Sequence, residues 1–118
     1  MIESSGVGTL SFTDSSVTLA YGTANQGRSL ILGGTNPGNN SFGKVLANNG
    51  TGACALRKSG TGKWILTCNN TYTNQTVVSA GTLIASADGA LGFSNITVAG
   101  GAALTLTNGV TNNYINDS

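Results

Sequence analysis

The chain has 118 residues, five basic and four acidic side chains and no histidine, so its formal net charge is +1. Without histidine, a catalytic triad that uses an imidazole is excluded, and four scattered carboxylates make a paired-carboxylate site unexpected. Charged residues make up only 8% of the chain, which lacks the basic footprint of a nucleic-acid-binding protein. The calcium-binding nonapeptide pattern of some β-helices is also absent. We therefore expect no enzymatic activity, no nucleic acid partner, no metal and no cofactor.

The apolar residues are scattered in short clusters. The longest apolar runs, such as residues 30–32, span three or four residues, far fewer than the roughly 18 that a membrane-spanning helix needs. We therefore expect no membrane insertion by this segment. The first residues lack the basic and apolar regions of a signal peptide, although this start does not decide the compartment of the protein.

Short strands are the dominant local signal along the chain. Apolar residues recur at a spacing of two over four to six residues, and no window carries the i, i+3, i+4, i+7 stripe of a helix. The candidate strands, in chain order, are residues 7–12, 17–21, 29–32, 42–47, 54–58, 63–68, 76–79, 82–85, 95–99 and 103–107. Because Gly, Thr, Asn and Ser make up 60 of the 118 residues, turns between these strands are plentiful. The pattern indicates an all-β protein with under about one residue in ten in helix.

Weak internal repetition favours a solenoid over a sandwich. The segments at residues 8–12, 81–85 and 102–106 share a shape, and Leu10 and Leu30 are 20 residues apart while Leu83 and Leu104 are 21 apart. A period of about 20 residues is typical of one coil of a β-helix, with Gly or Asn at the corners. We therefore predict a parallel β-helix of about five coils, with residues 1–118 as a single module.

A specific motif stands at residues 56–83. It begins with Leu56, Lys58, Gly60 and Gly62, continues through alternating apolar residues to Asn70, Tyr72 and Thr73, and ends on the run Ala80, Gly81, Thr82 and Leu83. This pattern closely resembles the autotransporter-associated β-strand repeat, which occurs in passenger domains of bacterial autotransporters and related large surface proteins. With its flanks, the resemblance covers about residues 28–107. It implies a right-handed parallel β-helix, located outside the cell or on the bacterial surface, that is not itself catalytic.

Three functions are consistent with these features, and we rank them in this order. The first is a non-catalytic structural module of an extracellular surface protein, such as an adhesin-like stalk or passenger. The second is a self-assembling subunit of an extracellular filament. The third is a carbohydrate-binding or polysaccharide-acting β-helix or a phage fibre, which the scarcity of carboxylates disfavours.

The two cysteines are placed symmetrically. Cys54 and Cys68 each lie seven residues from Thr61, and both share parity with the apolar residues of their strands. If residues 59–62 turn the chain back, the two side chains become cross-strand neighbours, and a disulfide would stabilise the fold by roughly 3 kcal/mol. The alternative is two buried thiols that pack as small apolar groups. For an extracellular chain we predict the Cys54–Cys68 disulfide.

Two further clusters have both a functional and a structural interpretation. Arg57, Lys58 and Lys63 surround the Gly-Thr-Gly turn and could form an anion cradle, but no helix follows to supply an N-terminus, so we expect a solvated charged corner. Trp64 and Tyr72 could stack on a sugar. The phase of Trp64 indicates a core position, whereas Tyr72 could take either role, so a surface glycan contact stays open.

The ends of the predicted solenoid are expected to be uncovered. The first and last candidate strands carry neither charge nor proline, which are the usual features that block a sheet edge. Neighbouring coils of a longer chain would cover these edges, or a second copy would do so by stacking end to end into a homopolymer. The residues expected at this contact are Leu10, Phe12, Leu104 and Leu106, with Tyr114 and Ile115 as apolar anchors in the tail.

Overall fold

The computed structural model describes residues 2–6, 8–13, 22–107 and 115–116. These residues form eleven strands and no helix, so the described part of the chain holds no helix that could cross a membrane. The strand expected at residues 17–21 lies outside the described residues.

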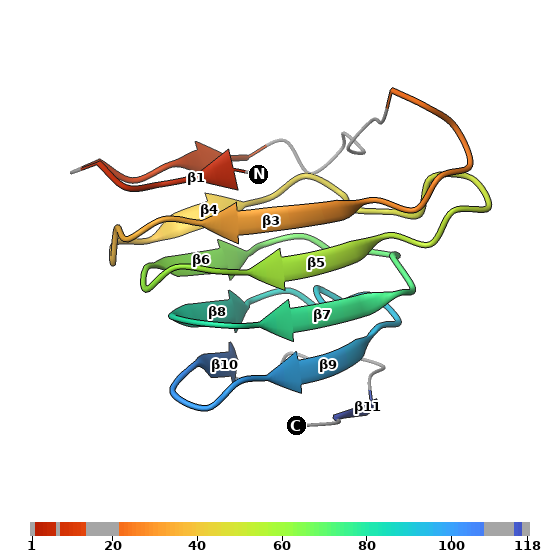
Figure 1. Ribbon diagram of the computed structural model, residues 1–118. Helices are drawn as coiled ribbons and strands as arrows, with labels where there is room; N and C mark the ends of the chain where they lie inside the picture. The colour runs from red at the N-terminus through yellow and green to blue at the C-terminus, as the bar shows by residue number, and fades with distance from the viewer. Residues whose placement is uncertain (1, 7, 14–21, 108–114, 117–118) are drawn as a thin grey trace.

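The strands alternate between two parallel sheets (Figure 1). The first sheet contains, in spatial order, β1 (Ile2–Glu3), β3 (Ser29–Gly33), β5 (Ala55–Lys58), β7 (Gln75–Val78), β9 (Asn95–Val98) and β11 (Ile115–Asn116). The second sheet contains β2 (Ser11–Phe12), β4 (Asn40–Phe42), β6 (Lys63–Leu66), β8 (Thr82–Ala85) and β10 (Ala103–Leu106). Each strand pairs with the strand two places along the chain, and every one of these pairs is parallel.

The chain winds as a right-handed coil. In Figure 1 it runs leftward along the first sheet, turns, and runs rightward along the second sheet behind it while it descends. This is the handedness that parallel crossover connections almost always take. The pairs β1–β2, β3–β4, β5–β6, β7–β8 and β9–β10 give five coils, and β11 begins another. The structure thus confirms the all-β class and the parallel β-helix.

The core lies between the two sheets because the apolar residues alternate along each strand. In β6, Trp64 and Leu66 are buried, and in β8 their register partners Leu83 and Ala85 are buried as well. Since parallel neighbours in register point the same way, side chains of successive coils stack in columns through the core. The period-two pattern of the sequence therefore encodes both the strands and their stacking.

A third side, built from an extended segment without a regular strand, closes the coil of β5 and β6. The segment at residues 67–73 alternates between exposed and buried positions, with Cys68, Asn70 and Tyr72 buried. Backbone hydrogen bonds join it to both neighbours: the amide of Thr71 donates to the carbonyl of Leu46 at 2.9 Å, and the amide of Phe93 donates to the carbonyl of Tyr72 at 3.0 Å. The coil is consequently held to its neighbours on all three sides.

One strand lies earlier than predicted. The sequence predicts a strand over residues 42–47, but β4 spans Asn40–Phe42 and the chain bends at Lys44. The expected strand left Asn40 outside, whereas β4 begins at this residue and its side chain is buried. The expectation was wrong because a buried asparagine in a strand resembles a turn asparagine in the sequence.

Candidate functional site: the corners that join the coils

Glycines stack at the corner that leads from the first sheet to the second. Gly34, Gly60 and Gly81 occupy successive coils there, with φ values of 100°, 70° and 68°. A Cβ atom on Gly81 would lie 2.3 Å from the carbonyl oxygen of Gly62 and 2.5 Å from that of Gly60. These distances are too short for any side chain, so the motif glycines permit the close approach of adjacent corners.

Lys58 fills the inside of this corner. Its side chain has no exposed surface, and its ammonium donates hydrogen bonds to the carbonyl oxygens of Ser59 at 2.7 Å, Gly60 at 2.8 Å and Ala80 at 3.3 Å. Burial lowers the pKa of this lysine below its usual value of 10.5. Because Ala80 belongs to the next coil, the ammonium joins two coils.

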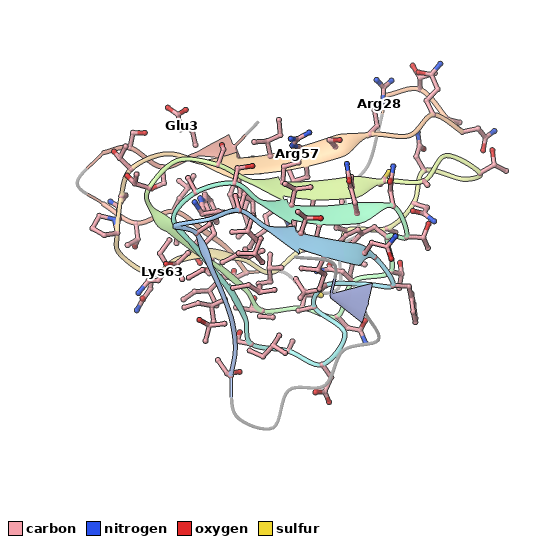
Figure 2. All side chains as sticks on the ribbon, turned by 60° about the horizontal axis from the view of Figure 1, so that its bottom comes forward. Glu3, Arg28, Arg57 and Lys63 are labelled. Carbon is pink, nitrogen blue, oxygen red and sulfur yellow. The ribbon has the colours of Figure 1, made fainter. Side chains whose placement is uncertain are left out.

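The three basic residues of this region do not converge. Arg57 is exposed on the outer face of the first sheet, and Lys63 points outward where β6 begins (Figure 2). Lys58 points the opposite way, into the corner. The predicted solvated corner is therefore wrong for Lys58, because backbone carbonyls replace water around its ammonium. The same divergence argues against an anion cradle made by these three side chains.

Trp64 also donates a hydrogen bond to a backbone carbonyl near this corner. Its indole is fully buried, and Nε1 donates to the carbonyl oxygen of Gly33 at 3.0 Å. A buried indole cannot stack on a sugar, so the core position expected for Trp64 is the one observed. The side chain thereby combines apolar packing with a hydrogen bond to the preceding coil.

Buried asparagines link coils on either side of their own. The amide oxygen of Asn40 accepts from Ser4 Oγ at 2.8 Å and from the backbone amide of Leu10 at 2.9 Å, and its Nδ2 donates to the carbonyl of Lys63 at 2.8 Å. One side chain thus connects the first, second and third coils. Nothing in the sequence distinguishes this inward asparagine from the turn asparagines, apart from its parity with Phe42.

Asn70 has the same role on the third side. Its Oδ1 accepts from the backbone amide of Leu46 at 2.8 Å, and its Nδ2 donates to the carbonyl of Ala90 at 2.7 Å. These partners belong to the coils before and after its own. Asn70 is part of the recognised motif, which was the signal in the sequence that this residue has a special position.

Tyr72 begins a chain of buried hydroxyl groups. Its phenol shares a 2.5 Å hydrogen bond with Thr76 Oγ1, which shares another of 2.7 Å with Ser94 Oγ, and Ser94 donates to the carbonyl of Leu91 at 2.7 Å. Burial raises the pKa of Tyr72 to about 12, partly offset by the hydrogen bonds from Thr76 and Ser94. Tyr72 has no exposed surface, so it offers no stacking platform for a sugar.

The structure places the two cysteines as separate buried thiols. The turn at residues 59–62 is a solenoid corner, so β5 and β6 belong to different sheets and are not hydrogen-bonded neighbours. The cross-strand geometry behind the predicted Cys54–Cys68 disulfide is therefore wrong. The thiol of Cys68 lies 3.4 Å from the carbonyl oxygen of Asn69, and burial raises its pKa.

The residues expected at the end-to-end contact fall in the terminal coils. Leu10 is 37% exposed, whereas Phe12, Leu104 and Leu106 are half-buried against the core. Tyr114 lies outside the described residues. Of Ile115, the structure gives the backbone, which pairs with Asn95 of β9.

Comparison with known proteins agrees with this geometry. Residues 56–85 match the family model of the passenger-associated-transport-repeat, a stretch that runs from the second residue of β5 to the end of β8. The chain is also 43% identical over 82 residues to the adhesin BmaC autotransporter of Brucella suis biovar 1 (strain 1330). That alignment covers 70% of this chain and 2% of the relative. No solved structure matches the chain.

These findings agree with the buried motif residues described above. The glycines, Lys58, Asn70 and Tyr72 of the matched segment are the residues that join its coils. The similarity to an autotransporter adhesin supports the extracellular, cell-surface location expected from the sequence. Residues 56–85 therefore match the passenger-associated-transport-repeat, as the sequence resemblance predicted, and most of the chain resembles a short segment of an autotransporter adhesin.

Proposed function

We propose that this chain is a non-catalytic stretch of solenoid whose two ends are covered by further coils of a longer surface passenger. The observation that carries the proposal is one core column in the second sheet, in which Phe12, Phe42, Leu66, Ala85 and Leu106 stack in register. The three middle residues are at most 1% exposed, whereas Phe12 and Leu106 at the two ends are only half-buried. Another coil at each end would bury them as fully as the middle three.

The length of the relative supports this arrangement. The chain spans about 2% of the length of that autotransporter adhesin, so a passenger of comparable length has ample chain for more coils. By analogy with its name, we propose that the module serves an adhesin-type passenger as a stalk. A glycan contact would have to use side chains other than Trp64 and Tyr72, such as Phe93, which is 58% exposed.

We also propose that this stretch of solenoid catalyses no reaction. The chain has no histidine and four carboxylates, which supply few groups for acid–base chemistry. Incubation of the purified chain with bacterial and host polysaccharides should give no turnover. Turnover that disappears in the Asp88→Asn variant would contradict the proposal.

A second candidate function is self-assembly into a filament. The same half-buried residues at both ends favour it, because two different uncovered surfaces on one subunit generate an open polymer. Sedimentation velocity over a wide concentration range, with electron microscopy of the same samples, separates the two candidates. A monomer at all concentrations supports the stalk and refutes the filament.

A variant pair sharpens this experiment. Leu104→Lys places a charge on the uncovered end of the core, and Thr105→Lys places it on the exposed outer face of the same strand. Fibres of the wild type and of Thr105→Lys, but not of Leu104→Lys, would support the filament and contradict the stalk.

A further inference from the structure

The corner around Lys58 has the composition of a cation site. All three acceptors of the ammonium are backbone carbonyl oxygens, those of Ser59, Gly60 and Ala80, at 2.7 to 3.3 Å. An ammonium has three donors, so three carbonyls satisfy it fully. Its side chain has no exposed surface, and these carbonyl dipoles take the place of its hydration shell.

The glycines give this site its shape. A Cβ on Gly81 would lie 2.8 Å from Nζ of Lys58, in addition to its contacts with the carbonyl oxygens of Gly60 and Gly62. The missing side chain therefore leaves room both for the ammonium and for the carbonyls that surround it. Converging carbonyl oxygens in a confined space are the groups that replace the hydration shell of monovalent cations.

We propose that the corner formed by residues 59–62 and 80–81 is a cradle for an alkylammonium group, which the chain supplies from its own Lys58. We call this corner the ammonium cradle. Two of its carbonyls, those of Ser59 and Gly60, come from the coil of Lys58, and the third, that of Ala80, comes from the next coil. The cradle is complete only when the two coils are stacked, so the bound ammonium locks one coil onto the next.

The register shows that the cradle is confined to this corner. Lys58 stacks between Leu32 in the preceding coil and Val78 in the following coil, and both of these side chains are fully buried and apolar. The family match covers residues 56–85, which contain both Lys58 and Ala80. The matched unit thus contains the cation and all three of its ligands.

Chemical rescue tests the ammonium cradle. Lys58→Ala removes Cγ, Cδ, Cε and Nζ, and n-propylammonium has the same four heavy atoms. We expect Lys58→Ala to unfold at a lower temperature than the wild type, and propylammonium chloride to raise its midpoint by stabilising the folded state through binding. Tetramethylammonium chloride at the same ionic strength, which has no N–H donor, should not do so.

Matched variants make the result specific. Lys63→Ala removes a lysine near the same corner whose side chain lies outside the cradle, and Lys58→Met keeps much of the volume without the charge. Neither variant, nor the wild type, should gain from propylammonium over tetramethylammonium. An equal shift in all of these proteins, or none in Lys58→Ala, would overturn the proposal.

A measurement on the wild type covers the case in which Lys58→Ala does not fold. In 15N spectra that detect lysine side chains, the ammonium protons of Lys58 should exchange slowly with water and give a resolved signal. The ammonium protons of Lys63 provide the internal comparison. Equally rapid exchange at both lysines would show that Lys58 is not held in a cradle and would refute the inference.

Discussion

Replacement of Gly81 by alanine tests the close packing of the corners. The new Cβ would lie 2.3 Å from the carbonyl oxygen of Gly62 and 2.8 Å from Nζ of Lys58, so the corner or the ammonium must move. Alanine at a φ of 68° costs about 1–2 kcal/mol, and a weakened hydrogen bond of a charged group costs about 1.5–3 kcal/mol more. We expect Gly81→Ala to lose roughly 3–5 kcal/mol of stability, near the upper end of the usual range for single substitutions.

Two glycines of the last coil serve as controls. Gly101 has a φ of 85°, but a Cβ added to it would meet nothing within 4 Å, and Gly100 has neither a positive φ nor a neighbour within 4 Å. Gly101→Ala should therefore lose only about 1–2 kcal/mol, and Gly100→Ala should be nearly neutral or gain about 0.4–1 kcal/mol.

Urea unfolding followed by circular dichroism measures these differences. The midpoints should fall in the order Gly100→Ala, Gly101→Ala, Gly81→Ala, with the last clearly separated from the others. If Gly81→Ala is no less stable than Gly101→Ala, the cost lies in the backbone conformation alone and the packing argument is refuted.

Three further predictions concern the third side of the coil. Asn70→Ala should lose about 2–4 kcal/mol of stability in urea unfolding, because it leaves the buried amide of Leu46 and the carbonyl of Ala90 without their partner. Asn69→Ala, at the exposed neighbouring position, is the control. A nearly neutral result for Asn70→Ala would contradict the linking role. Burial raises the pKa of Tyr72 from 10.0 to about 12. The unfolded state therefore releases the phenol proton before the folded state does, and the free energy of unfolding should fall by about 3 kcal/mol as the pH rises from 10 to 12. Tyr72→Phe should lack this alkaline decline. The lowered pKa of Lys58 acts equally in the wild type and in Tyr72→Phe, so parallel curves of stability against pH for these two proteins would refute the role given to Tyr72. Cys54 and Cys68, both buried, should react with a thiol reagent only on unfolding, and rapid reaction in the native protein would show that the region opens.

The strands and their inward faces could be predicted from the sequence because they depend on local alternation. Trp64 and Leu66 alternate in phase within β6, Leu83 and Ala85 alternate in phase within β8, and all four are buried; β8 also has the predicted bounds. Alternation also indicated short strands joined by corners, and the repeat motif indicated how they wind. These features need no knowledge of which residues meet across coils.

The polar residues inside the solenoid could not be predicted in the same way. A lysine and an asparagine are ordinarily surface or turn residues, and only the stacked carbonyls of neighbouring coils make Lys58 and Asn40 stable inside. The cysteine prediction failed for a related reason. A corner and a hairpin have similar Gly-rich sequences, but a corner sends β6 into the other sheet, so symmetric spacing about Thr61 does not make the two strands a hydrogen-bonded pair, and the structure forms no disulfide between Cys54 and Cys68.

The central claim is that the coils of residues 56–85 form a complete stack, whereas the terminal coils need another coil to cover them. Hydrogen–deuterium exchange on the isolated chain tests this most directly, since exchange reports local opening along the chain. The account predicts the slowest exchange in β5 through β8 and the fastest, among the described strands, in β1, β2 and β10. Protection of β2 and β10 equal to that of β6, in a protein shown to be monomeric in the same sample, would contradict it.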